Sequence, residues 1–350
     1  MKLFFCVWNR AEEFFWSSAK VADDRSEPNS EDSCLPAEAK KLSMLLKMPP
    51  CVRFGFNCVS SGTKIFVLGG SRSGKEGKAE YSDDVYMTDT SVSSPQWKKL
   101  PSMKVQRNWA AAAVVDGRVY VMGTMWKRQI PKPWGEFLDT NKIDDWDWEP
   151  MPSLLQMLED DYRAKRRELY PDEVFDDDHE EHVSIYDTKS IAVMSEGSEK
   201  RIFLGLGCPR INRCVVSFDV NAARWDFHDV TFCQCSLGMS REVKNVILDG
   251  TLFMFSSGCI VAYDLGKDKK VAHLPFRLDG WSHGGESFLF HLGNGDMCLV
   301  LQGPGSINGS EIWCQYFHLS HLDKDHDFEI VLGLLEKYMV KGKLCDCLLV

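Results

Sequence analysis

The residues best suited to chemistry lie in an acidic stretch, DEVFDDDHEEH, at residues 172–182. Its two histidines, His179 and His182, stand among carboxylates, and both kinds of side chain are ligands for divalent metals. A run of like charges is more often a solvated loop than a metal site. We therefore expect no metal and no cofactor, and we keep a metal-dependent enzyme as the alternative.

Other short patterns lack the context that catalysis needs. The segment GLGCPR at 205–210 ends an expected strand and opens no helix, so it is no phosphate-binding loop. His283-Gly284-Gly285 lacks the serine elbow that an oxyanion loop would serve. Cys347-Leu-Leu-Val350 fits the prenylation pattern in spacing, but valine is not a usual last residue. These observations favour a protein without catalytic residues.

A repeated unit organises the chain: a tight turn, an apolar strand and a terminal glycine. Its five copies are SGTKIFVLGG at 61–70, DGRVYVMG at 116–123, SEKRIFLGLG at 198–207, DGTLFMFSSG at 249–258 and NGDMCLVLQG at 294–303. Asp-Gly or Asn-Gly before an apolar run is a strong hairpin signal, because this turn matches the twist of the flanking strands. Repetition at roughly 50 residues is typical of a β-propeller. The fold class predicted is therefore all-β.

Two residue types recur at fixed places in the repeat and are expected to be structural. A tryptophan stands at the same place in the outer strand of three repeats, where we expect it to pack between adjacent blades. The expected structural positions are Gly69, Gly70, Trp97, Gly123, Trp148, Gly207, Trp225, Gly258 and Gly303.

The chain ends are expected to close the ring, because an open ring would leave unpaired strand edges. Residues 1–19 read as an apolar hairpin that contributes to closure, and 20–50 as a polar linker. Residues 51–350 form the propeller, with a helical and acidic insertion at 153–185. Six blades are expected, the sixth formed by residues 3–18 with a segment near 42–48 or the C-terminus. Five blades with a dangling N-terminus is the alternative.

Composition excludes several partners. The net charge of −10 argues against a broad nucleic-acid surface, which needs clustered Lys and Arg. No apolar run approaches the ~20 residues of a membrane span. The 13 cysteines are an odd number, and many lie within expected strands, so we expect free thiols in a reducing compartment, the cytoplasm or the nucleus.

The repeats carry a family resemblance over nearly the whole chain. The segments that show it are SSGTKIFVLGG (60–70), DDVYMTD (83–89), QWKKLPSM (96–103), WAAAAVVDGRVYVMG (109–123), LFFCVWNRAEEFFW (3–16), EIWCQYFHL (311–319) and FEIVLGLLEKYMV (328–340). Together they resemble the plant F-box/kelch-repeat proteins. The resemblance implies a kelch propeller that selects the target of an SCF-type ubiquitin ligase, while an F-box binds the Skp-family adaptor.

One departure from that family concerns the adaptor. The chain begins where the F-box would end, so we expect it not to bind a Skp-family adaptor directly unless the full-length gene supplies an F-box. The expected function is a non-enzymatic protein-protein interaction domain resembling the recognition part of such a receptor.

Two kelch enzymes supply the alternative. Glu168, Asp172 and Asp176 nearly match the E-x3-D-x3-H iron motif of the kelch-type specifier proteins, but the third residue is not histidine and Pro171 interrupts the helix. A copper oxidase of galactose-oxidase type needs a set of His, Tyr and Cys residues that no spacing singles out here.

The expected partner is a protein of unknown identity, bound by loops at one rim of the propeller. Trp and Arg dominate binding hot spots. The candidate contacts are Arg72, Trp126, Arg128, Trp134, Arg210, Arg213 and Trp281. An equal alternative is that Trp126 and Trp134 pack a long loop against its own blade.

Overall fold

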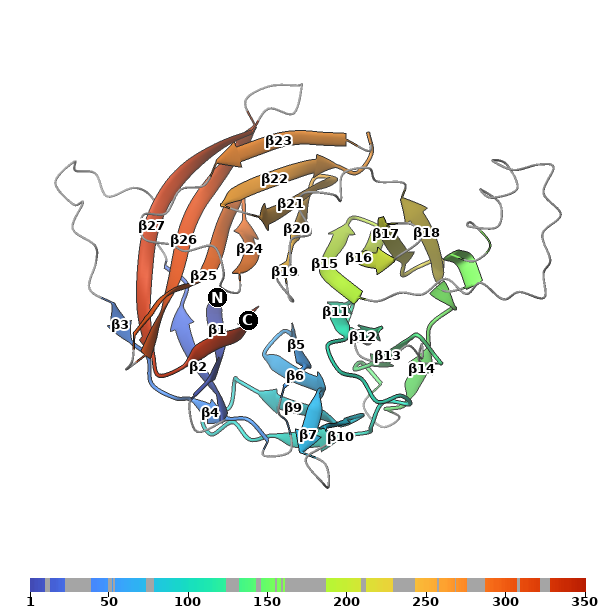
Figure 1. The fold of residues 1–350 in the computed structure, drawn as a ribbon, viewed down its shortest axis with the longest axis horizontal. Helices are drawn as coiled ribbons and strands as arrows, with labels where there is room; N and C mark the ends of the chain where they lie inside the picture. Colours follow the sequence, from blue (N-terminus) through green and yellow to red (C-terminus); the bar gives the residue numbers. More distant parts are fainter. Residues whose placement is uncertain are drawn as a thin grey trace.

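A computed structural model of the chain shows a six-bladed β-propeller, as the sequence predicts (Figure 1). It describes residues 1–9, 13–22, 39–49, 52, 54–73, 79–123, 132–142, 146–154, 156–158, 160, 187–208, 212–228, 243–256, 258–267, 269–275, 287–306, 309–321 and 328–350. The blades surround a central axis, and each has four principal strands.

Five blades follow one another along the chain, each running from an inner to an outer strand. Blade 1 comprises β5 (Phe56–Ser61), β6 (Lys64–Gly69), β9 (Val85–Asp89) and β10 (Lys98–Leu100). Blade 2 comprises β11 (Ala111–Val115), β12 (Arg118–Met122), β13 (Gly135–Asp139) and β14 (Trp148–Pro150). Blade 3 comprises β15 (Asp187–Glu196), β16 (Glu199–Cys208), β17 (Asn212–Asp219) and β18 (Arg224–His228). Blade 4 comprises β20 (Val246–Leu248), β21 (Thr251–Ser256), β22 (Cys259–Asp264) and β23 (Lys269–Pro275). Blade 5 comprises β24 (Ser287–Gly293), β25 (Asp296–Ser306), β26 (Gly309–His321) and β27 (Phe328–Val340).

The sixth blade is built from both chain ends. Its order is β28 (Lys343–Leu349), β1 (Lys2–Trp8), β2 (Phe14–Lys20) and β4 (Leu46–Lys47), with β28 innermost. Within β1, Phe5 stands opposite Ser17 of β2 on one side and Cys347 of β28 on the other. The six-blade prediction is therefore confirmed, and the closing blade uses both segments that were offered as alternatives. The five-blade alternative is wrong.

The expected linker is paired at its far end. Besides β4, it contains β3 (Lys40–Lys41), which lies parallel to β27. Lys40 Nζ lies 2.6 Å from the Glu336 carboxylate of β27, an ion pair that fastens this segment to blade 5.

Tight turns join the first two strands of blades 2, 4 and 5, as their Asp-Gly and Asn-Gly pairs predict. In blade 2, Asp116 has φ 50° and Gly117 φ 71°, the two positive values of a type I′ turn. Asp249-Gly250 and Asn294-Gly295 repeat this in blades 4 and 5. The short turns after the inner strands thus gather at one end of the axis, which we call the tight-turn face.

The opposite end carries the longer connections and is called the long-connection face. Strand direction places there every link from a second to a third strand and from one blade to the next. Examples are the links from Met122 to Gly135, Pro150 to Asp187 and Pro275 to Ser287. A small hairpin, β7 (Ser71–Ser73) with β8 (Ala79–Tyr81), lies in the link of blade 1.

One short strand departs from the regular pattern near the axis. β19 (Val243–Lys244) pairs in parallel with β15 of blade 3 and with β24 of blade 5. It thereby joins the two blades on either side of blade 4 into one continuous sheet.

A short helical segment follows blade 2. The backbone N–H of Gln156 donates to Ser153 Oγ at 3.4 Å, and residues 156–158 are helical. Leu154 and Leu158 are fully buried among the side chains of blades 2 and 3. Residues 161–186, which hold the acidic run, lie outside the described residues.

The repeated tryptophans connect neighbouring blades. The indole N–H of Trp148 donates to Pro101 O of blade 1 at 3.0 Å, and that of Trp225 to Pro152 O of blade 2 at 2.9 Å. Trp97 donates to Lys47 O of the closing blade at 2.8 Å. Trp148 and Trp225 are buried, whereas Trp97 is partly exposed.

We expect Trp148→Ala to cost about 3–5 kcal/mol of unfolding free energy, because it empties a fully buried site between two blades. Urea unfolding measures the loss. Trp97→Ala is the matched control, since it removes the same kind of inter-blade hydrogen bond at a partly exposed site. Equal losses for the two variants would contradict this account of inter-blade packing.

Candidate functional site

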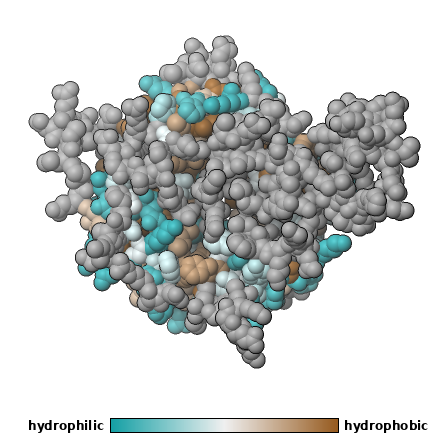
Figure 2. All heavy atoms as spheres, in the orientation of Figure 1, coloured by the Kyte–Doolittle hydropathy of each residue, from teal (hydrophilic) through white to brown (hydrophobic). Residues whose placement is uncertain are grey.

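Two of the expected contacts lie towards the long-connection face. Arg72 lies in the hairpin strand β7, and Arg213 near the start of β17, both towards this face. Trp126, Arg128, Arg210 and Trp281 lie outside the described residues. Figure 2 shows hydrophilic and hydrophobic residues interspersed over the described part of the surface in view.

Trp134 lies in the core. Its side chain is 5% exposed and packs edge to face against Trp225, with 5.6 Å between ring centroids. Since Trp225 belongs to β18 of blade 3, Trp134 packs its link between blades 2 and 3.

Two of the repeat glycines are required by close approaches. Gly69 has φ 64°, and a Cβ there would lie 2.4 Å from Arg107 O. At Gly303 a Cβ would lie 2.6 Å from the indole nitrogen of Trp313. Gly70, Gly123 and Gly258 also have positive φ, and Gly207 lies in β16.

Arg107 organises the link between blades 1 and 2. Its guanidinium and the Glu136 carboxylate lie 2.9 Å apart, and their side chains are 1% and 0% exposed. The guanidinium also donates to the carbonyl oxygens of Gly123, Pro133 and Trp134. Burial lowers the pKa of Arg107 and Glu136 raises it, with burial the larger effect. This buried pair holds the base of a long connection in place.

A second ion pair spans the axis. Lys244 Nζ of β19 lies 2.6 Å from Asp346 Oδ1 of β28 and donates to Cys347 O at 2.9 Å and Cys58 O at 3.3 Å. Asp346 Oδ2 accepts the backbone N–H of Cys58 at 3.2 Å. One lysine therefore links the strand beside blade 4 to blades 6 and 1. We call this set the axial ion pair.

The surroundings of the axial ion pair keep the lysine charged. Burial lowers the pKa of Lys244, but the Asp346 carboxylate and its hydrogen bond raise the pKa by more. The pKa of Lys244 therefore lies above its ordinary value. Asp346 is 1% exposed and Lys244 20% exposed. A buried carboxylate without its partner would be costly, so the two residues depend on each other.

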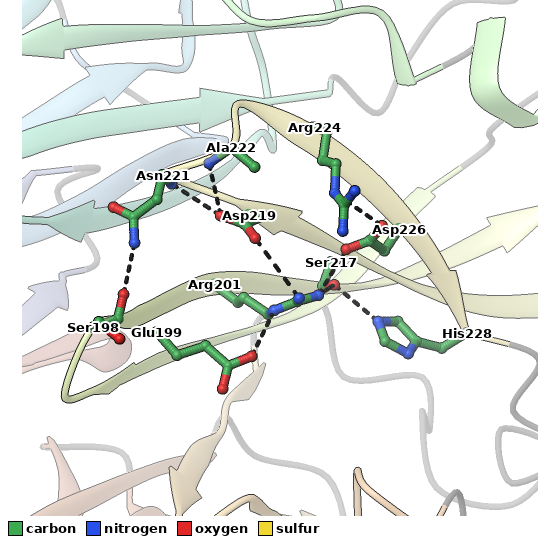
Figure 3. Close-up of polar contacts among 10 residues, drawn as sticks. All are labelled: Ser198, Glu199, Arg201, Ser217, Asp219, Asn221, Ala222, Arg224, Asp226 and His228. Atoms are coloured by element: carbon green, nitrogen blue, oxygen red, sulfur yellow. Dashed lines mark hydrogen bonds and ion pairs between the residues drawn. The ribbon is translucent and has the colours of Figure 1, made fainter.

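Blade 3 carries a separate charged cluster around Arg201 (Figure 3). The guanidinium of Arg201 on β16 contacts Asp226 of β18 at 2.7 Å, Glu199 at 3.0 Å and Asp219 of β17 at 3.7 Å. Backbone N–H donation from Ala222 is the main cause of a lowered pKa at Asp219. These ion pairs connect three neighbouring strands. The cluster therefore stabilises the blade.

The same cluster contains a serine and a histidine in contact. Ser217 Oγ lies 2.8 Å from His228 Nε2 (Figure 3). Ser217 is fully buried, so a substrate cannot reach its hydroxyl. The contact is an internal hydrogen bond rather than a nucleophile and its base.

Within the described ranges, no three His, Cys, Asp or Glu residues gather closely enough to hold a metal ion. The stretch 168–182 lies outside those ranges. No helix in the described part of the chain is long and apolar enough to cross a membrane.

The cysteines whose side chains the structure describes are free thiols. Cys347 is completely buried in β28, and burial raises its pKa well above the usual range. A lipid could reach this thiol only if the closing strand left the ring.

Comparison with known proteins agrees with the repeat. Residues 53–104, which include blade 1, match the family model of the Kelch motif. The chain carries a Kelch motif. It is 33% identical over 116 residues to an F-box/kelch-repeat protein of Arabidopsis thaliana, covering 33% of this chain and 25% of the relative. A kelch repeat-containing protein of the same plant is 32% identical over 112 residues, covering 32% and 24%.

The matched segments thus span about a quarter of the length of these relatives. Among solved structures, that of YjhT matches with a TM-score of 0.53 over 91% of each chain, at 12% identity. A likeness at that identity supports the propeller fold and nothing finer.

Sequence reasoning missed the axial ion pair. Lys244 lies in the segment EVKNVIL and Asp346 in Cys345-Asp346-Cys347, and no local pattern relates the two. The two are 102 residues apart, and only the closure of the ring brings them together.

We expect Lys244→Met to cost about 3–5 kcal/mol at pH 7, because it leaves Asp346 buried without its cation. The double variant Lys244→Met/Asp346→Leu should recover much of this loss. Chemical unfolding measures both, and Lys41→Met, at an exposed lysine of β3, is the control.

The effect should depend on pH in one direction. The folded-state pKa of Lys244 is raised, so its contribution is full below the unfolded value of about 10.4 and is lost as the pH rises through the folded value. The difference between wild type and Lys244→Met should stay constant from pH 7 to 9 and shrink at higher pH. A difference that grew with pH would contradict the axial ion pair.

Proposed function

We propose that this propeller is a non-enzymatic protein-recognition domain, and that it acts as the target-selecting part of an SCF-type ubiquitin ligase receptor. The observation that carries the proposal is the similarity to Arabidopsis proteins whose names join an F-box to kelch repeats. The Kelch motif and the closed propeller support it.

The target is assigned to the long-connection face. The turns between first and second strands at the other face are short, whereas links on this face, such as those from Met122 to Gly135 and from Pro150 to Asp187, are longer and vary from blade to blade. Binding residues are commonly carried on loops held by a rigid scaffold. The buried Arg107–Glu136 pair supplies such rigidity at the base of one link.

The candidate contacts are Arg72 and Arg213 on described strands, with Trp126, Arg128, Arg210 and Trp281 in neighbouring links. Arginine and tryptophan are the side chains that most often dominate binding energy. Contact with a Skp-family adaptor would require an F-box. A receptor that holds both adaptor and target raises the effective concentration of the target at the site of ubiquitin transfer. The free buried thiols fit a reducing compartment, the cytoplasm or the nucleus.

The test is affinity isolation from plant extract with the intact propeller as bait. Proteins enriched by wild type should fall about tenfold or more with Arg72→Glu/Arg213→Glu, because a reversed charge at a contact costs more than 1.4 kcal/mol. Quantitative mass spectrometry measures the enrichment, and the strongest protein is then titrated in purified form.

The matched control is Lys142→Glu/Lys64→Glu, which makes the same change of charge towards the tight-turn face. It should leave the enrichment intact. If no protein titrates with purified wild type, or if only the control pair abolishes binding, the proposal fails.

A further inference from the structure

The axis holds a cavity of about 520 Å³ that the proposed function does not use. Residues from the inner strands of all six blades line it, among them Val59, Ala113, Val193, Val246 and Leu348. The volume falls within the range of small-molecule sites. The lining is mainly apolar, which favours a ligand with an apolar body.

The cavity lies towards the tight-turn face. Along β15 the lining runs from Ile191, the partner of Lys244, to Ser195 near the turn. Exposed Asp249, in the first turn of blade 4, also belongs to the lining. Lys244 therefore lies at the inner end and the tight turns at the mouth. A ligand would enter from the end of the axis opposite the face assigned to the protein target.

Two residues of the lining each carry a polar atom with unmet hydrogen-bonding capacity. Asn245 Oδ1 and His291 Nε2 are buried and have no hydrogen-bond partner within the described part of the chain. They come from neighbouring blades, Asn245 just before β20 and His291 within β24. A buried polar atom without a partner is unfavourable, and a ligand group that donates a hydrogen bond would remove that penalty.

We propose that the axial cavity binds a small, largely apolar molecule carrying a hydroxyl or N–H donor, with Asn245 accepting the hydrogen bond and His291 beside it. Lys244 contributes little net charge, because Asp346 neutralises it. The site therefore selects a neutral donor over an anion. Since the mouth and the long-connection face are at opposite ends of the axis, small molecule and protein target can be bound together.

The probes are 2-naphthol, an aromatic ring system with one donor hydroxyl, and 2-methoxynaphthalene, which has the same rings and no donor. Calorimetric titration of the full chain should show saturable binding of 2-naphthol and about tenfold weaker binding of 2-methoxynaphthalene, one hydrogen bond being worth about a factor of ten. Asn245→Leu should weaken the binding of 2-naphthol about tenfold and abolish the preference for 2-naphthol over 2-methoxynaphthalene.

Two further variants separate the cavity from other surfaces. Val193→Phe should fill the cavity and abolish binding of both probes; if it fails to fold, Ser195→Trp blocks the exposed mouth instead. Asn57→Leu is the matched control, because its Oδ1 is also buried with no partner among the described residues but Asn57 does not line the cavity. It should leave binding unchanged.

Three results would overturn the proposal: no saturation with wild type, as for a cavity that holds water only; equal affinity for the two probes; or binding that survives the filled or blocked cavity.

Discussion

The pairing of β1 with β28 is the constraint on which the rest of the propeller depends. It joins residues from the two ends of the chain into one sheet, so the sixth blade exists only when both ends are in place. Closure removes the strand edges that an open ring would expose. It also carries Asp346 to the axis, where the carboxylate meets Lys244 from the opposite side of the ring. Sheet pairing within the sixth blade and an ion pair at the axis therefore stabilise the same closed state.

Much of the fold could be predicted because its signals are local and repeated. Asp116-Gly117 and its counterparts specify a turn from two adjacent residues, and the recurrent tryptophans mark one position in three of the units. The closing hairpin could be recognised from its two apolar segments and from the need to pair the ends. The axial ion pair and the Arg107–Glu136 pair could not, because each joins distant residues that no local pattern relates. Trp134 shows the same limit. Its residue type suits a surface contact and a core position equally, and only its ring contact with Trp225 shows that it lies in the core.

The closed ring gives the molecule two chemically different ends. Long links gather at one end, where rigid buried pairs such as Arg107–Glu136 hold their bases. At the other end, short turns surround an apolar cavity with Lys244 at its inner end. The proposed recognition of a protein and the proposed binding of a small molecule use separate ends of one axis, and both require that the sixth blade be closed. The Arg201 cluster of blade 3 takes part in neither proposed site, since its charged groups pair with one another within the blade (Figure 3).

Hydrogen exchange of the native chain tests this closure most directly. Closure by the chain ends predicts that the amides of β1 and β28 that face each other, those of Phe4 and Leu348 among them, exchange as slowly as those of Phe66 in β6, because the sixth blade opens only when the ring unfolds. Rapid exchange throughout β1 and β28, with β6 still protected, would show that pairing of the chain ends does not close the ring and would contradict the account.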